Sequence, residues 1–213
     1  MAGKSGDGDV WVWVALDSDS KVVISYLVGD RSAGCAYEFI GDLAGRVVKR
    51  IQLTSDGYFA YPNSVLASFG HDVDYGVLIK VFGPDASENS NERRYSPGTC
   101  NGSRKVKQLG MPDRRYISTS YVERQNASLR LFNKRFSRLT LALSKRLINH
   151  QHAVFLHYFA HNFMRKCRTI GTTPAMAAGI ADKVWTADDL ISALEDEEQK
   201  LAKGGRINRE DRS

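Results

Sequence analysis

Two carboxylates stand where the sequence favours metal chemistry. Asp56 closes the stretch RIQLTSD and is followed by Gly57, so we expect it at the end of a short strand. Glu123 lies in SYVERQN, in the predicted first turn of a helix, where the helix dipole favours a negative charge. The ends of strands in α/β sheets open onto the ligand crevice. Mg²⁺ prefers a few carboxylates together with substrate phosphate oxygens, so the pair predicts a metal-assisted phosphodiester site.

Positive charge follows Glu123 along the chain. Asn126, Arg130 and Lys134 stand three, seven and eleven residues after it, which places them on one face of a continuous helix. From Arg124 to Ala181 there is no Asp or Glu, but there are ten Lys and Arg residues. This asymmetry, in a chain of net charge +6, favours a polyanion partner. The residues that we expect to contact this polyanion are Arg124, Asn126, Arg130, Lys134, Arg138 and Lys145.

Each of these residues also fits a simpler role. Asp56-Gly57 is a common turn pair, Glu123 alone is an ordinary acid at a helix start, and Arg130 alone is an ordinary solvated cation.

His157 and His161 have the spacing of a zinc pair on a helix, with His150 and His152 nearby. However, the chain has no HExxH motif, and the alternative is a helix that packs on the core with some His facing DNA.

The composition limits the class of protein. The chain has 213 residues, of which 42% are hydrophobic, which is enough for one substantial core. Its three cysteines form no CxxC pair, which favours a reducing compartment. The sequence has no apolar signal-peptide core and no run of about 18 apolar residues. We therefore expect a cytoplasmic protein with no membrane partner.

The first half of the chain predicts a mixed α/β sheet with flanking helices. Strands at 10–17 and 21–30 form a hairpin around the turn DSDSK. Ser32 caps a helix whose inward face carries Ala36, Phe39, Ile40 and Leu43. The segment 50–61 contains a short strand that ends in a turn at Ser55-Asp56-Gly57. A weak helix and a strand at 74–83 complete the order β-β-α-β-α-β.

The second half is predicted to be mainly helical. Residues 83–115 form a basic insertion rich in Gly, Pro, Asn and Ser, in which RKVKQL is a candidate edge strand. A long helix capped by Ser118 or Ser120 follows, with a stripe of Val122, Leu129, Phe136 and Leu143. We expect further helices after Asn149, a short piece with Pro174 in its first turn, and a helix capped by Thr186.

These pieces resemble a known family. The stretches WVWVALDSDSKVVISYLVGDRS, QLTSDGYFAY, STSYVERQNASLR, RFSRLTLALSKR and NFMRKCRTIGTTPAMAAGI are similar, in this order, to the IS-one type of bacterial insertion-sequence transposase, a DDE transposase. The resemblance covers most of residues 9–190. It implies an RNase H-like catalytic domain over 9–170, which contains the basic insertion at 83–115 and is followed by a C-terminal helical extension at 171–200. The polar, Gly-containing composition of residues 201–213 predicts a disordered tail.

The resemblance implies an activity and a site. Such enzymes perform metal-dependent DNA cleavage and strand transfer during DNA recombination, with Mg²⁺ or Mn²⁺ as cofactor. The family's second carboxylate falls on Asp56, its glutamate on Glu123, and its basic residue seven places later on Arg130. The implied partners are the double-stranded DNA of element ends and target and further copies of the chain on that DNA, at the bacterial nucleoid.

The chain departs from the family at its start. The family's first catalytic Asp lies on a strand that precedes the hairpin, whereas here WVWVALD corresponds to the second strand. Asp17 then falls in the hairpin turn, and Asp9 is a weaker substitute. We therefore expect the first strand and first Asp to be missing. Two alternatives follow: a catalytically dead, truncated transposase remnant that only binds DNA, or a different RNase H-like nuclease.

Overall fold

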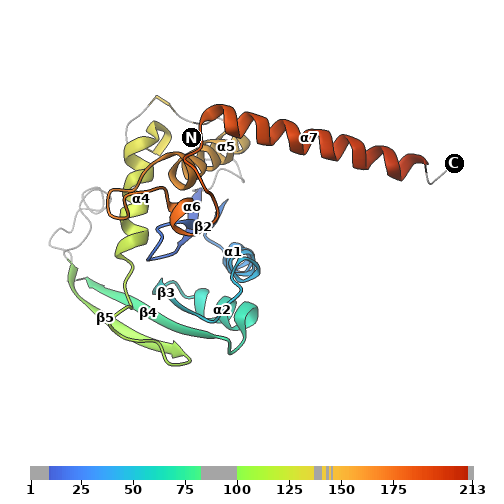
Figure 1. The fold of residues 1–213 in the computed structure, drawn as a ribbon. Coiled ribbons are helices and arrows are strands. Elements are labelled where there is room, and N and C mark those ends of the chain that lie inside the picture. Colours follow the sequence, from blue (N-terminus) through green and yellow to red (C-terminus); the bar gives the residue numbers. More distant parts are fainter. Residues whose placement is uncertain (1–9, 83–99, 137–140, 143, 145, 211–213) are drawn as a thin grey trace, which may run out of the picture. The chain divides into compact units, whose positions relative to one another are not determined.

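The structure is a computed structural model that describes residues 10–82, 100–136, 141, 142, 144 and 146–210. It is a mixed α/β protein with a mixed sheet and flanking helices, which confirms the predicted class (Figure 1). The chain forms two compact units, residues 1–18 with 23–154 and residues 19–22 with 155–213. Each unit is described separately below.

The first unit begins with the predicted hairpin and helix. Strands β1 (Trp11–Leu16) and β2 (Val23–Gly29) pair antiparallel. Helix α1 (Ala33–Arg46) starts at Ser32, whose hydroxyl accepts the backbone N–H of Cys35 at 3.2 Å. Its buried side chains are the four predicted ones, Ala36, Phe39, Ile40 and Leu43. The local pattern was sufficient here because apolar residues at helical spacing have one face to bury.

The mixed sheet follows. Strands β3 (Ile51–Asp56) and β4 (Val73–Phe82) are parallel, and helix α2 (Tyr61–Phe69) connects them. Strand β5 (Cys100–Leu109) pairs antiparallel with β4 over its length, so the candidate edge strand RKVKQL belongs to a longer strand (Figure 1). The remainder of the expected insertion, residues 83–99, lies outside the described residues.

The described strands form two sheets, β1-β2 and β3-β4-β5, where the sequence predicted one. A single apolar cluster nevertheless joins the hairpin, both helices and the mixed sheet; it includes Trp13, Phe39, Leu43, Val65 and Tyr75. Trp13 is 7% exposed and packs in this cluster. Trp11 is 43% exposed, because its side chain lies against Arg31 instead.

The long helix predicted after residue 118 is wrong in its extent and its cap. Helix α4 spans Ser120–Phe132, and a 3-10 turn follows at Lys134–Phe136. The helix ends because Asn133 takes an extended backbone conformation, φ −124° and ψ 103°, and its side-chain oxygen accepts the N–H of Arg135 at 3.2 Å. Phe132 is consequently 60% exposed. Thr119 stands at the N-cap and neither Ser118 nor Ser120 caps the helix. Leu143 lies outside the described residues.

Helices dominate the second unit. Helix α5 (Leu147–Phe159), whose last residues belong to this unit, continues as a π-helix (Ala160–Met164), and α6 (Pro174–Ala177) is capped by Thr173. Helix α7 (Ala187–Glu210) starts at the predicted cap, where Thr186 and Asp189 exchange hydrogen bonds. The helix continues to Glu210, past the expected start of the tail at 201. Among the described helices, none combines the length and apolar composition that a membrane span requires.

Candidate functional site

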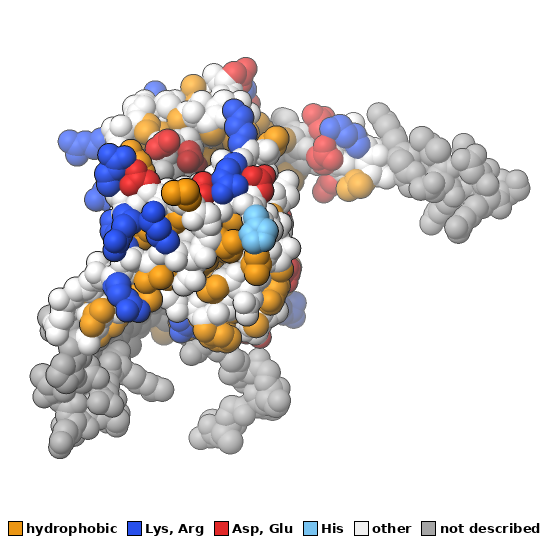
Figure 2. Space-filling view, turned by 90° about the horizontal axis from the view of Figure 1, so that it is seen from below, with side chains coloured by type: hydrophobic (Ala, Val, Ile, Leu, Met, Phe, Trp, Pro, Cys, Tyr) orange, Lys and Arg blue, Asp and Glu red, His pale blue; other side chains and the backbone are white. Residues whose placement is uncertain are grey.

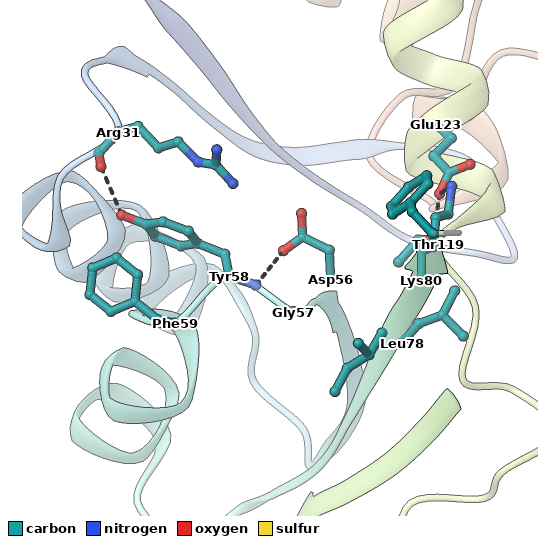
Figure 3. A pocket seen from close by; sticks show the side chains of 11 residues that line it. Arg31, Asp56, Gly57, Tyr58, Phe59, Leu78, Lys80, Thr119 and Glu123 are labelled. Carbon is teal, nitrogen blue, oxygen red and sulfur yellow. Dashed lines mark hydrogen bonds and ion pairs between the residues drawn. The ribbon is translucent and has the colours of Figure 1, made fainter. Parts of the chain in front are cut away.

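A pocket of the first unit brings Asp56 and Glu123 together. Its volume is about 770 Å³, and it opens where β3 ends, beside the outer half of β4 and the first turn of α4 (Figure 3). Aromatic, charged and aliphatic side chains line it: Arg31, Asp56, Gly57, Tyr58, Phe59, Leu78, Ile79, Lys80, Phe82, Thr119 and Glu123. The two carboxylates that the sequence singled out therefore share one cavity.

Asp56 is held by the parallel pairing of its strand. It is the last residue of β3 and pairs with Leu78 of β4. One carboxylate oxygen, Oδ1, accepts the backbone N–H of Tyr58 at 3.1 Å, which turns the chain away from the sheet. Among the described residues this carboxylate makes no ion pair. It remains exposed at the pocket, with a second oxygen directed away from the turn (Figure 3).

Glu123 is paired with a lysine from the sheet. The Nζ atom of Lys80 lies 2.7 Å from Glu123 Oε1, and the Thr119 hydroxyl donates to the same oxygen at 2.6 Å. The hydrogen bond from Lys80, followed by that from Thr119, lowers the pKa of Glu123 below its ordinary value. The same contact raises the pKa of Lys80. Glu123 is thus a carboxylate at neutral pH whose Oε1 already has a cationic partner.

Two contacts, one with β3 and one with β4, place the start of α4 beside the mixed sheet. The side chain of Gln52 forms two hydrogen bonds with the backbone of Asp113, at 2.8 and 3.0 Å. Farther along, the fully buried Ile117 packs over Gly76 of β4. A Cβ atom at Gly76 would lie 2.6 Å from Ile117 Cδ1, so only glycine allows this close approach. These contacts position Thr119 and Glu123 at the pocket.

Arg31 lies at the opposite side of the pocket, against two aromatic rings. Its guanidinium carbon is 4.7 Å from the centroid of the Trp11 ring and 5.0 Å from that of Tyr58. The Tyr58 hydroxyl donates to the backbone oxygen of Arg31 at 2.8 Å, and the Tyr58 ring packs edge-on against Trp13, with centroids 5.5 Å apart. The ring that supports Arg31 is therefore itself anchored in the core. Figure 3 shows the guanidinium extending toward the space in front of Asp56.

Those residues expected to contact DNA that the structure describes lie outside the pocket. Arg124, Asn126 and Arg130 lie on α4 with Glu123, but none of them lines the pocket. The prediction that Lys134 shares their helix face is wrong, because α4 ends at Phe132 and Lys134 belongs to the following 3-10 turn. Arg138 and Lys145 lie outside the described residues.

Acidic residues accompany many of the basic side chains on the surface. On the face shown in Figure 2, carboxylates lie among the Lys and Arg side chains. In the first unit, Arg50 pairs with Asp74 at 2.8 Å, Arg115 with Asp113 at 2.6 Å, and Arg46 with Asp42 at 2.8 Å. These arginines are already neutralised by partners, which limits what they contribute to binding an anion.

The sequence reasoning missed Arg31, Lys80 and Tyr58 as residues of the site. A signal for Lys80 was present: β3 and β4 are parallel, so residues near the carboxyl end of β4 lie beside Asp56. Lys80 stands two residues after Leu78, the partner of Asp56. No local signal marks Arg31, because its position depends on Trp11 and Tyr58, which are distant in sequence.

His157 on α5 and His161 on its continuation serve as packing groups, whereas His152 is exposed. His157 is 8% exposed, and a ring nitrogen of His161 lies 3.0 Å from the backbone oxygen of Lys21. Within the part of the chain that the structure describes, no three His, Cys, Asp or Glu side chains gather to hold a metal. The zinc hypothesis therefore has no third ligand there. Among the described residues, the pocket offers two carboxylates, Asp56 and Glu123.

No protein-family model, no curated protein and no solved structure matches the chain. The class of the protein is therefore defined by its own fold, a mixed α/β unit with a carboxylate pocket at the end of a parallel strand pair.

Proposed function

We propose that the first unit is the catalytic part of a DDE transposase, which cleaves double-stranded DNA and transfers strands during transposition of an insertion sequence. The observation that carries the proposal is the shared pocket of Asp56 and Glu123, which come from distant segments of the chain. The resemblance gives these two residues the family's second and third carboxylate positions. The proposal includes a homo-oligomer on DNA, in the bacterial cytoplasm.

The arrangement of strands supports an RNase H-like fold. An antiparallel hairpin precedes α1, and a parallel pair, β3 and β4, follows it. Among the described residues, β1 pairs only with β2 and β3 pairs only with β4. Each therefore keeps an edge on which a further strand can pair. The resemblance expects such a strand before the hairpin, carrying the first Asp.

The chemistry of the donors fits a hard divalent cation. Asp56 and Glu123 would hold Mg²⁺ or Mn²⁺, since both metals accept carboxylate oxygens and keep several waters. When bound, such a metal activates the attacking oxygen and stabilises the charge that develops on the phosphodiester. The Lys80 ammonium, which now neutralises Glu123 Oε1, would leave that oxygen and become available to the phosphate. Thr119 keeps the carboxylate oriented through its 2.6 Å hydrogen bond.

Nicking of supercoiled plasmid DNA in the presence of Mg²⁺ or Mn²⁺ tests the proposal. Asp56→Asn and Glu123→Gln are each expected to reduce the rate by at least about 100-fold, because loss of a ligand costs more than loss of its supporting partner. The matched control is Glu38→Gln, an exposed carboxylate on α1 that does not line the pocket. It should nick at the wild-type rate. Equal nicking by all four proteins would contradict the assignment.

One observation favours a second function, a remnant that binds DNA without cutting it. The Lys80–Glu123 ion pair supplies internally the positive charge that a metal would otherwise provide. In that case the wild-type chain binds DNA equally well with Mg²⁺ and with EDTA, and it produces no nicks. Binding should weaken as salt is added, since it depends on contacts with phosphates.

A further inference from the structure

We propose that Arg31 is a phosphate-binding residue, whose guanidinium binds a phosphodiester of the nucleic acid that enters the pocket. The inference rests on the proposed function for the identity of that ligand. It adds a substrate-positioning residue that neither the sequence pattern nor the resemblance assigns.

The first argument is that Arg31 is held in place without using its hydrogen-bond donors. Its guanidinium carbon lies within 5.0 Å of the Tyr58 centroid and closer to that of Trp11. Contact with aromatic faces leaves the N–H groups at the edge of the guanidinium plane free. Because the rings restrict the side chain, less conformational entropy is lost when it binds an anion.

The second argument is the absence of an anionic partner. Among the described residues, Arg31 makes no ion pair and no side-chain hydrogen bond, since its contacts are the two aromatic rings. Other arginines of this unit behave differently: Arg46, Arg50 and Arg115 all pair with carboxylates. Five N–H donors on an exposed, oriented guanidinium match the oxygens of a phosphate.

The third argument is the charge of the pocket. Asp56 and Glu123 repel a phosphodiester, and the ammonium of Lys80 is engaged with Glu123 Oε1 at 2.7 Å. Arg31 is therefore the cation of the pocket lining whose charge is not already neutralised by a carboxylate. Figure 3 shows Arg31 and Lys80 on opposite sides of Asp56, so the two cations are separate within the pocket.

The test measures DNA binding and its dependence on salt. Fluorescence anisotropy of a labelled 30-base-pair duplex, in EDTA, is recorded for the wild-type chain, Arg31→Ala, Arg31→Lys and the control Lys49→Ala. We expect Arg31→Ala to weaken binding by about tenfold, the typical value of one charge-assisted hydrogen bond. The slope of log K against log salt should fall by about 0.9, the value for one lost phosphate contact. A purely structural role of Arg31 would leave that slope unchanged.

The two other variants sharpen the result. Arg31→Lys keeps the charge but loses the planar fork, so it should recover the salt slope and only part of the affinity. Lys49 is exposed just before β3 begins, at the end of that strand opposite Asp56, so Lys49→Ala should bind as the wild type does. If the wild-type chain binds DNA and Arg31→Ala retains both the wild-type affinity and slope, the inference is wrong.

A second probe separates this inference from the proposed function. Inorganic pyrophosphate is titrated while tryptophan fluorescence is recorded, because Trp11 lies against the guanidinium. A saturable change in the wild-type chain that Arg31→Ala abolishes supports the anion site without any use of DNA. If pyrophosphate binds in this way but DNA does not, the anion site is supported and the proposed function fails. If neither ligand binds, both are wrong.

Discussion

At the scale of single residues, the ion pair between Lys80 and Glu123 has two consequences. It places a cation at the carboxylate that the proposed metal needs, and it keeps Glu123 ionised by lowering its pKa. Both side chains are substantially exposed, at 40% and 49%, so the pair contributes only about 0–1 kcal/mol to stability. Its importance therefore lies in competition with a metal rather than in holding the fold together.

Replacing Lys80 should strengthen metal binding. In Lys80→Met, a divalent cation no longer displaces an ammonium from Glu123, so Mn²⁺ affinity is expected to rise roughly two- to fivefold, given the modest energy of an exposed pair. Isothermal titration calorimetry with Mn²⁺ measures this directly. Lys107→Met, an exposed lysine on β5 outside the pocket, is the matched control and should leave the affinity unchanged. Weaker binding by Lys80→Met would show that Lys80 supports the metal site.

His157 should make the protein less stable in mild acid. Burial, then the positive charges of Arg165 and His161, lower its pKa to about 4, and its Nε2 atom has no hydrogen-bond partner among the described residues. Below about pH 6.5 the unfolded chain binds a proton that the folded chain refuses until about pH 4. The free energy of unfolding therefore falls as the pH decreases through this window.

The variant His157→Leu isolates this effect. Urea denaturation followed by circular dichroism, between about pH 7 and about pH 5, should show a loss of stability smaller than in the wild type by about 1–2 kcal/mol. Leucine fills a similar volume and cannot titrate, so the comparison depends mainly on the proton. Parallel pH profiles for the two proteins would mean that His157 is protonated in the folded state near its ordinary pKa.

At the scale of elements, the segment that leads into α4 decides the geometry of the pocket. Gln52 of β3 binds the backbone of Asp113, and Ile117 fills the space above Gly76 of β4. Each contact joins this segment to the sheet that carries Asp56. Glu123 therefore reaches the pocket because the sheet, and not α4 itself, fixes where the helix starts.

Gly76→Ala should disturb this junction. Its Cβ would lie 2.6 and 2.7 Å from two side-chain atoms of Ile117, which is fully buried and cannot move freely. We expect a loss of about 1–3 kcal/mol in the free energy of unfolding, typical of overpacking, and faster amide hydrogen exchange in residues 111–119. Gly102→Ala on β5 is the control, because a Cβ there meets no atom within 4 Å. Equal stability of the two variants would argue against this role of Gly76.

At the scale of the whole molecule, the division of the strands into two sheets matters most. Strands β1 and β3 each have an unpaired edge among the described residues, although their side chains contribute to one apolar cluster. Unpaired edges of this kind are templates for pairing with another chain.

The chain alone is therefore expected to associate. Sedimentation velocity at increasing protein concentration should show a growing fraction of larger species, and the soluble yield should be low. A synthetic peptide that supplies a compatible strand should reduce the association by covering the edges. A soluble monomer that melts in one sharp transition would contradict this prediction.

Much of the local structure was predictable from the sequence. The spans of β1 to β4, the inward face of α1 and the caps Ser32 and Thr186 follow from signals within a few residues: alternation, helical spacing and a side chain that accepts a nearby N–H. The carboxylates of the site were predictable too, because a strand end and a helix start are local positions.

Other features depended on contacts between distant segments. The helix that begins at Ser120 ends at Phe132, although its apolar spacing continues, because Asn133 binds the backbone of Ala153 through its side chain and caps the next turn. Likewise, the position of Arg31 is set by Trp11 and Tyr58.

The sequence by itself thus determined the strands β1 to β4, the inward face of α1 and the caps Ser32 and Thr186, and it identified the two carboxylates that stand at a strand end and a helix start. Only the tertiary structure decided that the strands separate into two sheets, that Lys80 neutralises Glu123, and that Arg31 faces the same pocket. The reason is physical. Periodicity and capping are short-range properties of the chain, whereas ion pairing, ring contact and strand pairing depend on which distant surfaces the folded chain brings within a few ångströms of each other.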